Sequence, residues 1–311
     1  MLFLPYKMDS RRRGLPIITV LICAACLVVY ATQYKSENRF VEAATNFCKE
    51  SVDLNTEEIL QRISDTYPNK SCIWAFEKIR EADDRQVAID NLVSTLEPLR
   101  LFATVEDNQQ YMASQIDERA RRYALYVPRE LTQDLAYDPN EPQFLKMITS
   151  TFSHGSLMHL LGNLLFFFVF GASVELIIGF FAYALFIAVA TIGTSLGYSY
   201  LMIGVEGALP TIGLSGVVMA TLAALGVMMP RARIRCFFWF IWIFRIFRIP
   251  AYLLVVWYVG WDLYELNRTA EVSLINYASH VTGALIGGLV GATYFVFAKE
   301  TISRAEMAYA S

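Results

Sequence analysis

The sequence is poor in charged residues and in histidine for its length. Asp, Glu, Lys and Arg make up 18% of its 311 residues, whereas 55% are hydrophobic. A soluble globular protein is typically about 25% charged and about 45–50% apolar. This composition argues against a soluble single-domain enzyme and a disordered protein. The formal net charge of −3 provides no basic excess, so no nucleic-acid partner is expected.

Histidine and cysteine are too few and too scattered to predict a metal or a cofactor. The chain has three histidines and five cysteines. Cys23 and Cys26 form a C-x-x-C pair, which could suggest metal or redox chemistry, but no further ligands lie nearby and packing inside a helix is expected. Cys48 and Cys72 could form one disulfide in an oxidising compartment.

The charge is unevenly distributed. Residues 33–145 contain 21 acidic and 13 basic residues, a net charge of −8, whereas the rest of the chain contains 8 acidic and 13 basic residues, a net charge of +5. The acidic segment has helix-like apolar spacing, no internal repeats and several prolines. It is predicted to be one mostly helical soluble domain.

Long apolar runs dominate the remainder. A membrane-spanning helix needs about 20 mostly apolar residues, and six runs qualify, although the fourth and fifth are short or interrupted. Residues 231–249 mix five arginines with large aromatics, which suits a membrane–water interface. The six predicted spans are Leu15–Ala31, Leu157–Val174, Leu176–Ile203, Gly213–Met229, Pro250–Leu266 and Tyr277–Ala298.

Basic residues near the span ends predict the orientation. Arg11–Arg13 precede the first span, the arginines of 231–248 separate the fourth from the fifth, and Lys299 and Arg304 follow the sixth. Such residues favour the cytoplasmic side, which places the N-terminus in the cytoplasm and residues 33–145 outside.

Residues 1–31 could instead be a cleaved signal peptide. The apolar stretch is longer than a usual signal core and no A-x-A site follows it, so an anchor is preferred. The predicted organisation is a cytoplasmic tail (1–14), a first span (15–31), an extracytoplasmic domain (33–145), a five-span core (146–298) and a cytoplasmic tail (299–311).

Three polar motifs interrupt the apolar spans. His159 and Asn163 are four residues apart, so they share one helix face and can donate to the same point. Ser215 lies between glycines in Gly213–Gly216, which alone would usually indicate close helix packing. His280 begins a helix face continued by Gly283 and Gly287.

With alternating spans, these motifs fall at one depth, near the outer surface. A nucleophile, a base that can reach it across a glycine face and a pair of hydrogen-bond donors are the parts of a serine acyl-transfer site. Their common depth is unexpected for three unrelated packing features.

The motifs HGSLMHLLGN (154–163), GLSG (213–216) and HVTGALIGG (280–288) resemble those of the rhomboid family of intramembrane serine proteases. The similarity covers roughly residues 146–298. It implies an all-α fold, a six-helix rhomboid-like bundle with the outer domain inserted between helices 1 and 2. The roles implied are nucleophile for Ser215, general base for His280, oxyanion hole for His159, Asn163 and the Ser215 amide, and support for His154, Gly213 and Gly216.

The sequence departs from the family pattern in three places. Leu145 and Lys146 replace a Trp-Arg pair, Met219 replaces an aromatic that often stacks on the histidine, and the 33–145 insertion is long. An acidic third member would be Asp262 or Glu265. Both residues are expected to lie on the protein surface, so a Ser-His dyad is predicted.

The resemblance implies a serine-type endopeptidase that cleaves single-pass transmembrane proteins near the outer membrane face. A catalytically inactive rhomboid-like pseudoprotease and a channel or transporter are the alternatives. A bacterial inner membrane with a periplasmic 33–145 domain is expected, and the oligomeric state stays open. Any pH dependence of activity in the neutral range is expected to trace to His280.

Overall fold

The structure, a computed structural model, is mostly helical and describes residues 2–8, 14–67, 72–202, 205, 208–240, 243–268 and 275–297. Contacts divide the chain into two compact units, residues 34–131 and residues 1–33 with 132–311. Arg11–Arg13, Lys299 and Arg304, which predicted the orientation, lie outside the described residues.

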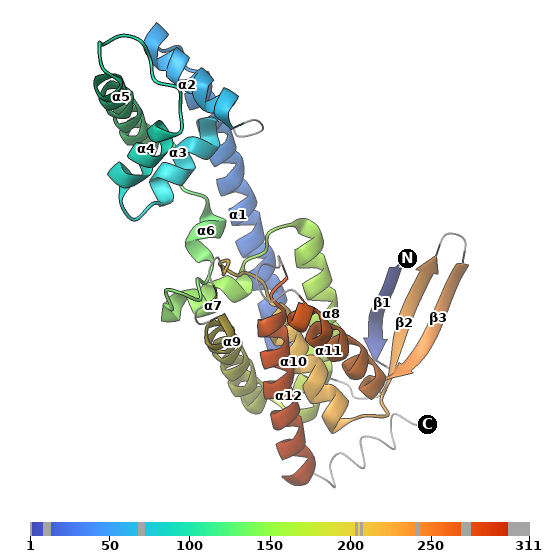
Figure 1. Ribbon diagram of the computed structural model, residues 1–311. Coiled ribbons are helices and arrows are strands. Elements are labelled where there is room, and N and C mark those ends of the chain that lie inside the picture. Colours follow the sequence, from blue (N-terminus) through green and yellow to red (C-terminus); the bar gives the residue numbers. More distant parts are fainter. Residues whose placement is uncertain are drawn as a thin grey trace. The chain divides into compact units, whose positions relative to one another are not determined.

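In chain order the elements are β1 (Leu2–Met8), α1 (Ile17–Lys49), α2 (Leu54–Thr66), α3 (Cys72–Glu81), α4 (Arg85–Ser94), α5 (Val105–Tyr126), α6 (Leu131–Leu135), α7 (Phe144–Phe152), α8 (Leu157–Ile178), α9 (Phe180–Met202), α10 (Ser215–Met228), β2 (Arg233–Phe240), β3 (Ile243–Pro250), α11 (Ala251–Arg268) and α12 (Tyr277–Phe297) (Figure 1).

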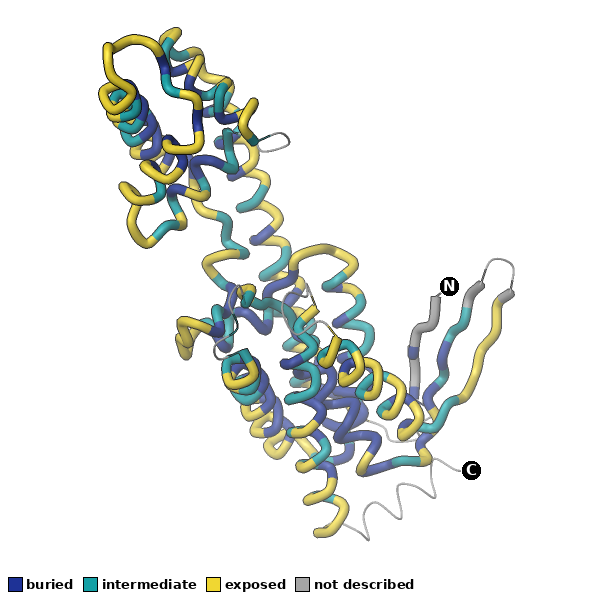
Figure 2. Tube along the Cα trace, viewed as in Figure 1, coloured by how far each residue is buried: buried dark blue, intermediate teal, exposed yellow. Residues whose placement is uncertain are grey.

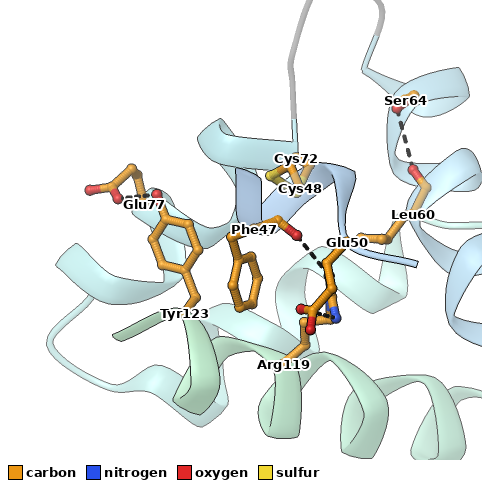
Figure 3. Close-up of a disulfide and its surroundings, with 9 residues drawn as sticks. All are labelled: Phe47, Cys48, Glu50, Leu60, Ser64, Cys72, Glu77, Arg119 and Tyr123. Atoms are coloured by element: carbon orange, nitrogen blue, oxygen red, sulfur yellow. Dashed lines mark hydrogen bonds and ion pairs between the residues drawn. A yellow bond between two sulfur atoms is a disulfide. The ribbon is translucent and has the colours of Figure 1, made fainter. Parts of the chain in front are cut away.

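The 34–131 unit is a small helical domain with its own apolar core. The second half of α1 and helices α2 to α5 contribute to this core, and Phe47 of α1 packs edge-on against Tyr123 of α5, with ring centroids 5.2 Å apart. The Tyr123 hydroxyl donates a 2.6 Å hydrogen bond to Glu77 (Figure 3). Burial, reinforced by this carboxylate, raises the pKa of Tyr123.

A disulfide closes this domain. Cys48 at the end of α1 is bonded to Cys72 at the start of α3, with Cα atoms 6.0 Å apart (Figure 3). This is the pairing that the sequence left open. A disulfide closing a loop of this length stabilises a fold by about 3 kcal/mol.

The 34–131 unit ends earlier than the predicted 33–145 domain. Tyr137 exchanges two backbone hydrogen bonds with Thr211, of 3.0 and 2.8 Å, and is fully buried in a cluster with Met147 and Tyr198. Tyr137 therefore packs with the helical bundle of the other unit, to which the contacts assign residues 132–145.

Within the described residues, four helices are long and apolar enough to cross a membrane: α1, α8, α9 and α12. The protein is therefore an integral multi-pass membrane protein. The predicted fourth span corresponds to α10, which is apolar but has 14 residues, about 21 Å of helix. The predicted fifth corresponds to α11, whose 18 residues include Asp262.

Helix α10 lies inside the bundle. Nearly all of its residues are buried (Figure 2), and it contacts α8, α9, α11 and α12. A helix that is apolar on all sides must be covered by other helices or by lipid, and here the neighbouring helices cover it. This enclosure explains how a helix shorter than a bilayer is accommodated at the centre of the unit.

A three-stranded antiparallel sheet corrects the all-α prediction. β2 pairs with β3 and with β1, in the order β1-β2-β3. Ile234 and Cys236 of β2 are buried with Met8 of β1 in the core of the bundle, whereas Arg233 is exposed. This alternation has the period of a strand. Residues 231–249, predicted from their arginines and aromatics as an interfacial segment, thus form most of β2 and β3.

Glu175 near the end of α8 accepts hydrogen bonds from the start of α1. Its carboxylate receives the backbone N–H groups of Ile18 and Thr19, at 2.9 and 2.8 Å, and the Thr19 hydroxyl at 2.7 Å. A carboxylate satisfies the N–H groups that a helix start leaves unpaired and also interacts favourably with the helix dipole. Glu175, itself 5% exposed, thus joins two membrane helices.

We expect Glu175→Gln to destabilise the bundle by about 2 kcal/mol, because a neutral amide loses the charge-assisted bonds and brings an extra donor. The thermal unfolding midpoint in detergent measures the effect. Thr19→Val, which removes one of the three bonds, provides the graded control and is expected to cost less. Equal midpoints for wild type and Glu175→Gln would contradict this role.

Candidate active site

Ser215 is the first residue of α10 and follows a loop that three other parts of the chain hold in place. Thr211 pairs with the backbone of Tyr137, and the Gly213 N–H donates to the Ser150 carbonyl at 2.8 Å. The Tyr198 hydroxyl donates to Leu209 at 2.7 Å. The N–H groups of a first helical turn have no partner within the helix, so they remain available beside Ser215.

Gly213 allows two polar side chains of α8 to approach this loop. Its φ of +122° is a conformation that other residues rarely adopt. A Cβ atom at this position would lie 2.8 Å from His159 Nε2 and 3.6 Å from Asn163 Nδ2. The two nitrogens therefore converge on the space next to Ser215, as their four-residue spacing predicts.

Helix α8 begins directly before these side chains. Ser156 caps it by accepting the His159 N–H at 3.1 Å. Asn163 is 8% exposed, and its Nδ2 atom has no hydrogen-bond partner among the described residues. A buried donor without a partner is costly, and such groups often indicate a ligand site.

Asn276, which the sequence analysis did not identify, links the start of α12 to the loop before Ser215. Its Oδ1 accepts the Ser279 N–H at 2.8 Å, and its Nδ2 donates to the Thr211 hydroxyl at 3.0 Å. An Asn directly before a helix, capping the third residue, is a common N-terminal pattern that the sequence contains. The cap fixes the first turn of α12, which carries His280.

His280 contacts an acidic residue of α11. Its Nδ1 atom lies 3.1 Å from Asp262 Oδ2, and Asp262 is 8% exposed. The expectation of ordinary surface placement for Asp262 was wrong. This contact forms because α11 is rotated about its axis so that Asp262 faces α12. Tertiary packing, and not the local sequence, sets that rotation.

Close packing brings α12 against α10. A Cβ atom on Gly283 would collide with the Gly216 carbonyl oxygen, and one on Gly216 would lie 2.5 Å from Ser279 Oγ. Glycine at both positions allows the backbones to meet. His280, one turn before Gly283, is thereby held next to the start of α10.

A cavity of about 590 Å³ brings the predicted residues together. Ser215, His280, His159 and Asn163 all line it. Apolar side chains form much of the rest of the wall. They include Met158, Phe166, Val218 and Met219. A mostly apolar cavity with a few polar side chains is typical of a site that binds an apolar ligand and orients it through those polar groups.

His154 lies behind this cavity and does not line it. It is 1% exposed, its ring centroid is 5.1 Å from that of His159, and its backbone N–H donates to Gln33 Oε1 at 3.1 Å. Gln33, fully buried on α1, also donates to Thr132 at 2.7 Å. A lone glutamine at the end of an apolar run is a weak pattern, and the sequence analysis missed it.

The residues at which the sequence differs from the rhomboid pattern lie in different parts of the structure. Met219 lines the cavity, one turn after Ser215. Tyr277 instead places its ring edge-on to His280, with centroids 6.2 Å apart. Leu145 is 72% exposed near the start of α7, outside the cavity wall, and Lys146 follows it.

The fold and the site define an integral membrane protein with a serine and a histidine in one cavity inside a helical bundle. Among the described residues, no group of three or more His, Cys, Asp or Glu could hold a metal ion. The rhomboid domain model matches residues 141–297, and the chain belongs to the rhomboid family. That family comprises serine intramembrane proteases and pseudoproteases. A comparison with curated proteins gives no match.

Proposed function

We propose that the protein is an intramembrane serine endopeptidase in which Ser215 is the nucleophile and His280 the general base. The observation that carries this proposal is the shared cavity of Ser215, His280, His159 and Asn163. Retention of both a serine and a histidine favours a protease over a pseudoprotease.

In the proposed reaction, Ser215 attacks the scissile carbonyl while His280 accepts the hydroxyl proton. The carbonyl oxygen becomes an oxyanion, which the amide of Asn163, the imidazole of His159 and the Ser215 N–H stabilise. His280 then protonates the leaving amine, and water releases the acyl group by the same steps in reverse. The unpartnered Asn163 Nδ2 supports this assignment, because an oxyanion would supply its acceptor.

The proposed topology has six spans, with α10 and α11 as the fourth and fifth. The N-terminus is cytoplasmic and the 33–145 segment is an extracytoplasmic insertion between the first two spans. The Cys48–Cys72 disulfide supports this side for the insertion, because disulfides persist in oxidising compartments. A bacterial inner membrane with a periplasmic insertion is the location we propose.

The proposed substrates are single-pass membrane proteins that enter laterally from the bilayer. Peptide bonds in a transmembrane helix are shielded by their hydrogen bonds. Substrates with helix-breaking Gly or Pro near the cleavage site should therefore be preferred. Cleavage is expected near the outer face, where Ser215 begins α10.

Labelling with a fluorophosphonate tests this function. Detergent-solubilised wild type should be labelled and should cleave a model transmembrane substrate, whereas Ser215→Ala should do neither. Ser279→Ala is a matched control, because Ser279 lies close to Gly216 on the neighbouring helix. Binding of membrane proteins without Ser215-dependent labelling or cleavage would instead establish a pseudoprotease.

Asn163→Ala is expected to lower the rate constant for substrate cleavage by about 10²–10³-fold, because one oxyanion donor is lost. The loss should fall on kcat rather than on KM, since the oxyanion exists only in the transition state. Steady-state cleavage of a model substrate measures both. Ser279→Ala, which lies outside the cavity wall, is again the comparison and should leave kcat close to that of wild type. A change in KM alone for Asn163→Ala would argue against the oxyanion role.

A further inference from the structure

A buried carboxylate on α11 faces the histidine of the cavity. Asp262 Oδ2 and His280 Nδ1 are 3.1 Å apart, and the two side chains are only 11% and 14% exposed. An ionisable side chain in an apolar setting is expensive unless it is paired, and it usually has a function. His280 is the partner that the fold provides for Asp262.

This contact selects one tautomer of His280. An ionised carboxylate has acceptor lone pairs and no donor, so Nδ1 is the protonated nitrogen of the ring. The nitrogen left with a free lone pair is Nε2. Since His280 lines the cavity that also contains Ser215, Nε2 is the atom available to accept the serine proton.

We infer that Asp262 is a positioning residue for His280, so that the site is a Ser215–His280–Asp262 relay rather than a dyad. The inference rests on the proposed function, because it assigns Asp262 a part in the same reaction. Asp262 touches no substrate atom. It holds the imidazole in orientation and tautomer and stabilises the imidazolium that forms.

The proton balance gives Asp262 its role. The Ser215 proton moves to His280 Nε2 as the bond from Oγ to the carbonyl carbon forms. The resulting imidazolium keeps its Nδ1 proton in the hydrogen bond to Asp262, which stays ionised. The proton on Nε2 then passes to the leaving nitrogen as the C–N bond breaks, and His280 returns to its starting tautomer.

The other groups near His280 do not supply this negative charge. His159 of α8 shares the cavity, Tyr277 lies one turn earlier on α12, and Ser215 is neutral. In the part of the chain that the structure describes, Asp262 is the acidic residue whose carboxylate lies within ion-pair distance of His280.

A purely structural role makes a different prediction. If Asp262 only tied α11 to α12, its loss would lower stability and leave the acylation kinetics of the folded protein unchanged. Glu175, another buried carboxylate that joins two helices, is the matched control, because it lies outside the cavity wall.

The test measures fluorophosphonate labelling of the full-length protein over a range of probe concentrations. Asp262→Asn is expected to lower the maximal labelling rate by about 10²–10⁴-fold. The probe concentration giving half the maximal rate should change by less than about threefold. Asp262→Glu, which keeps a carboxylate, should recover at least about tenfold over Asp262→Asn. Glu175→Gln should lower the unfolding midpoint and leave the maximal rate within about threefold of wild type.

Two outcomes would overturn the positioning role and leave the protease intact. One is wild-type labelling at Ser215 together with an Asp262→Asn rate that matches it. The other is a labelling rate that falls, in both Asp262→Asn and Glu175→Gln, only in proportion to the fraction of protein that remains folded. Absence of Ser215-dependent labelling in wild type would overturn the proposed function and the positioning role with it.

Discussion

Replacing His280 with alanine is expected to lower the rate of Ser215 acylation by about 10⁵–10⁶-fold, because a serine hydroxyl at neutral pH is a poor nucleophile without a base. Ser215 and His280 line the same cavity, and the close packing of α10 and α12 does not depend on the imidazole. The loss of labelling rate should therefore far exceed the loss of stability, which comes from leaving the buried Asp262 carboxylate without its partner. The rate of fluorophosphonate labelling and the thermal unfolding midpoint, measured on the same preparation, separate the two.

Two controls make this result specific. The double variant Ser215→Ala/His280→Ala should be no slower in substrate cleavage than either single variant, because residues that act as a unit are not additive. Added imidazole should restore part of the labelling of His280→Ala, since the cavity left by the side chain can hold a free base. Labelling of His280→Ala within about tenfold of wild type would show that another group activates Ser215.

Each of the four side chains that the sequence predicts for the site lies in a short motif. His159 and Asn163 share a helix face through their spacing, and the glycines around Ser215 and after His280 indicate a close helix contact. These local patterns place the four side chains around one cavity.

Features that depend on tertiary packing were harder to predict. Whether Asp262 faces water, lipid or His280 depends on the rotation of α11 about its axis, and one acidic residue in a short helix does not determine it. Gln33 is similar, since its partner His154 is separated from it by 121 positions in the sequence. The disulfide was left open because two cysteines in one acidic segment are compatible with pairing but do not require it.

The sheet was missed for a different reason. Ile234 and Cys236 alternate with Arg233 and Arg235 in the sequence, but a segment rich in arginines and aromatics is equally compatible with a membrane–water interface. The pairing of β1 with β2 joins residues near the N-terminus to residues beyond 230, and no local pattern indicates such a partner.

Gly287→Ala is expected to disrupt the bundle, although it adds a single methyl group. A Cβ atom at Gly287 would collide with the carbonyl oxygen of Ala220, and backbone atoms cannot move aside as a flexible side chain can. Overpacking a close helix contact costs about 1–3 kcal/mol or more. We expect a marked fall in the thermal unfolding midpoint in detergent.

Gly288 provides the control one residue further along the same helix. A Cβ atom at Gly288 would meet no neighbouring helix within 4 Å, so Gly288→Ala should be neutral or stabilise α12 by up to about 1 kcal/mol, as alanine does relative to glycine in helices. The contrast between neighbouring alanines tests the close approach of α10 and α12 rather than helix propensity. Because Gly283 and Gly287 lie on the face that holds His280 beside Ser215, the Gly287→Ala protein that remains folded should also be labelled more slowly. Equal midpoints and equal labelling for the two variants would mean that the helices do not meet at Gly287.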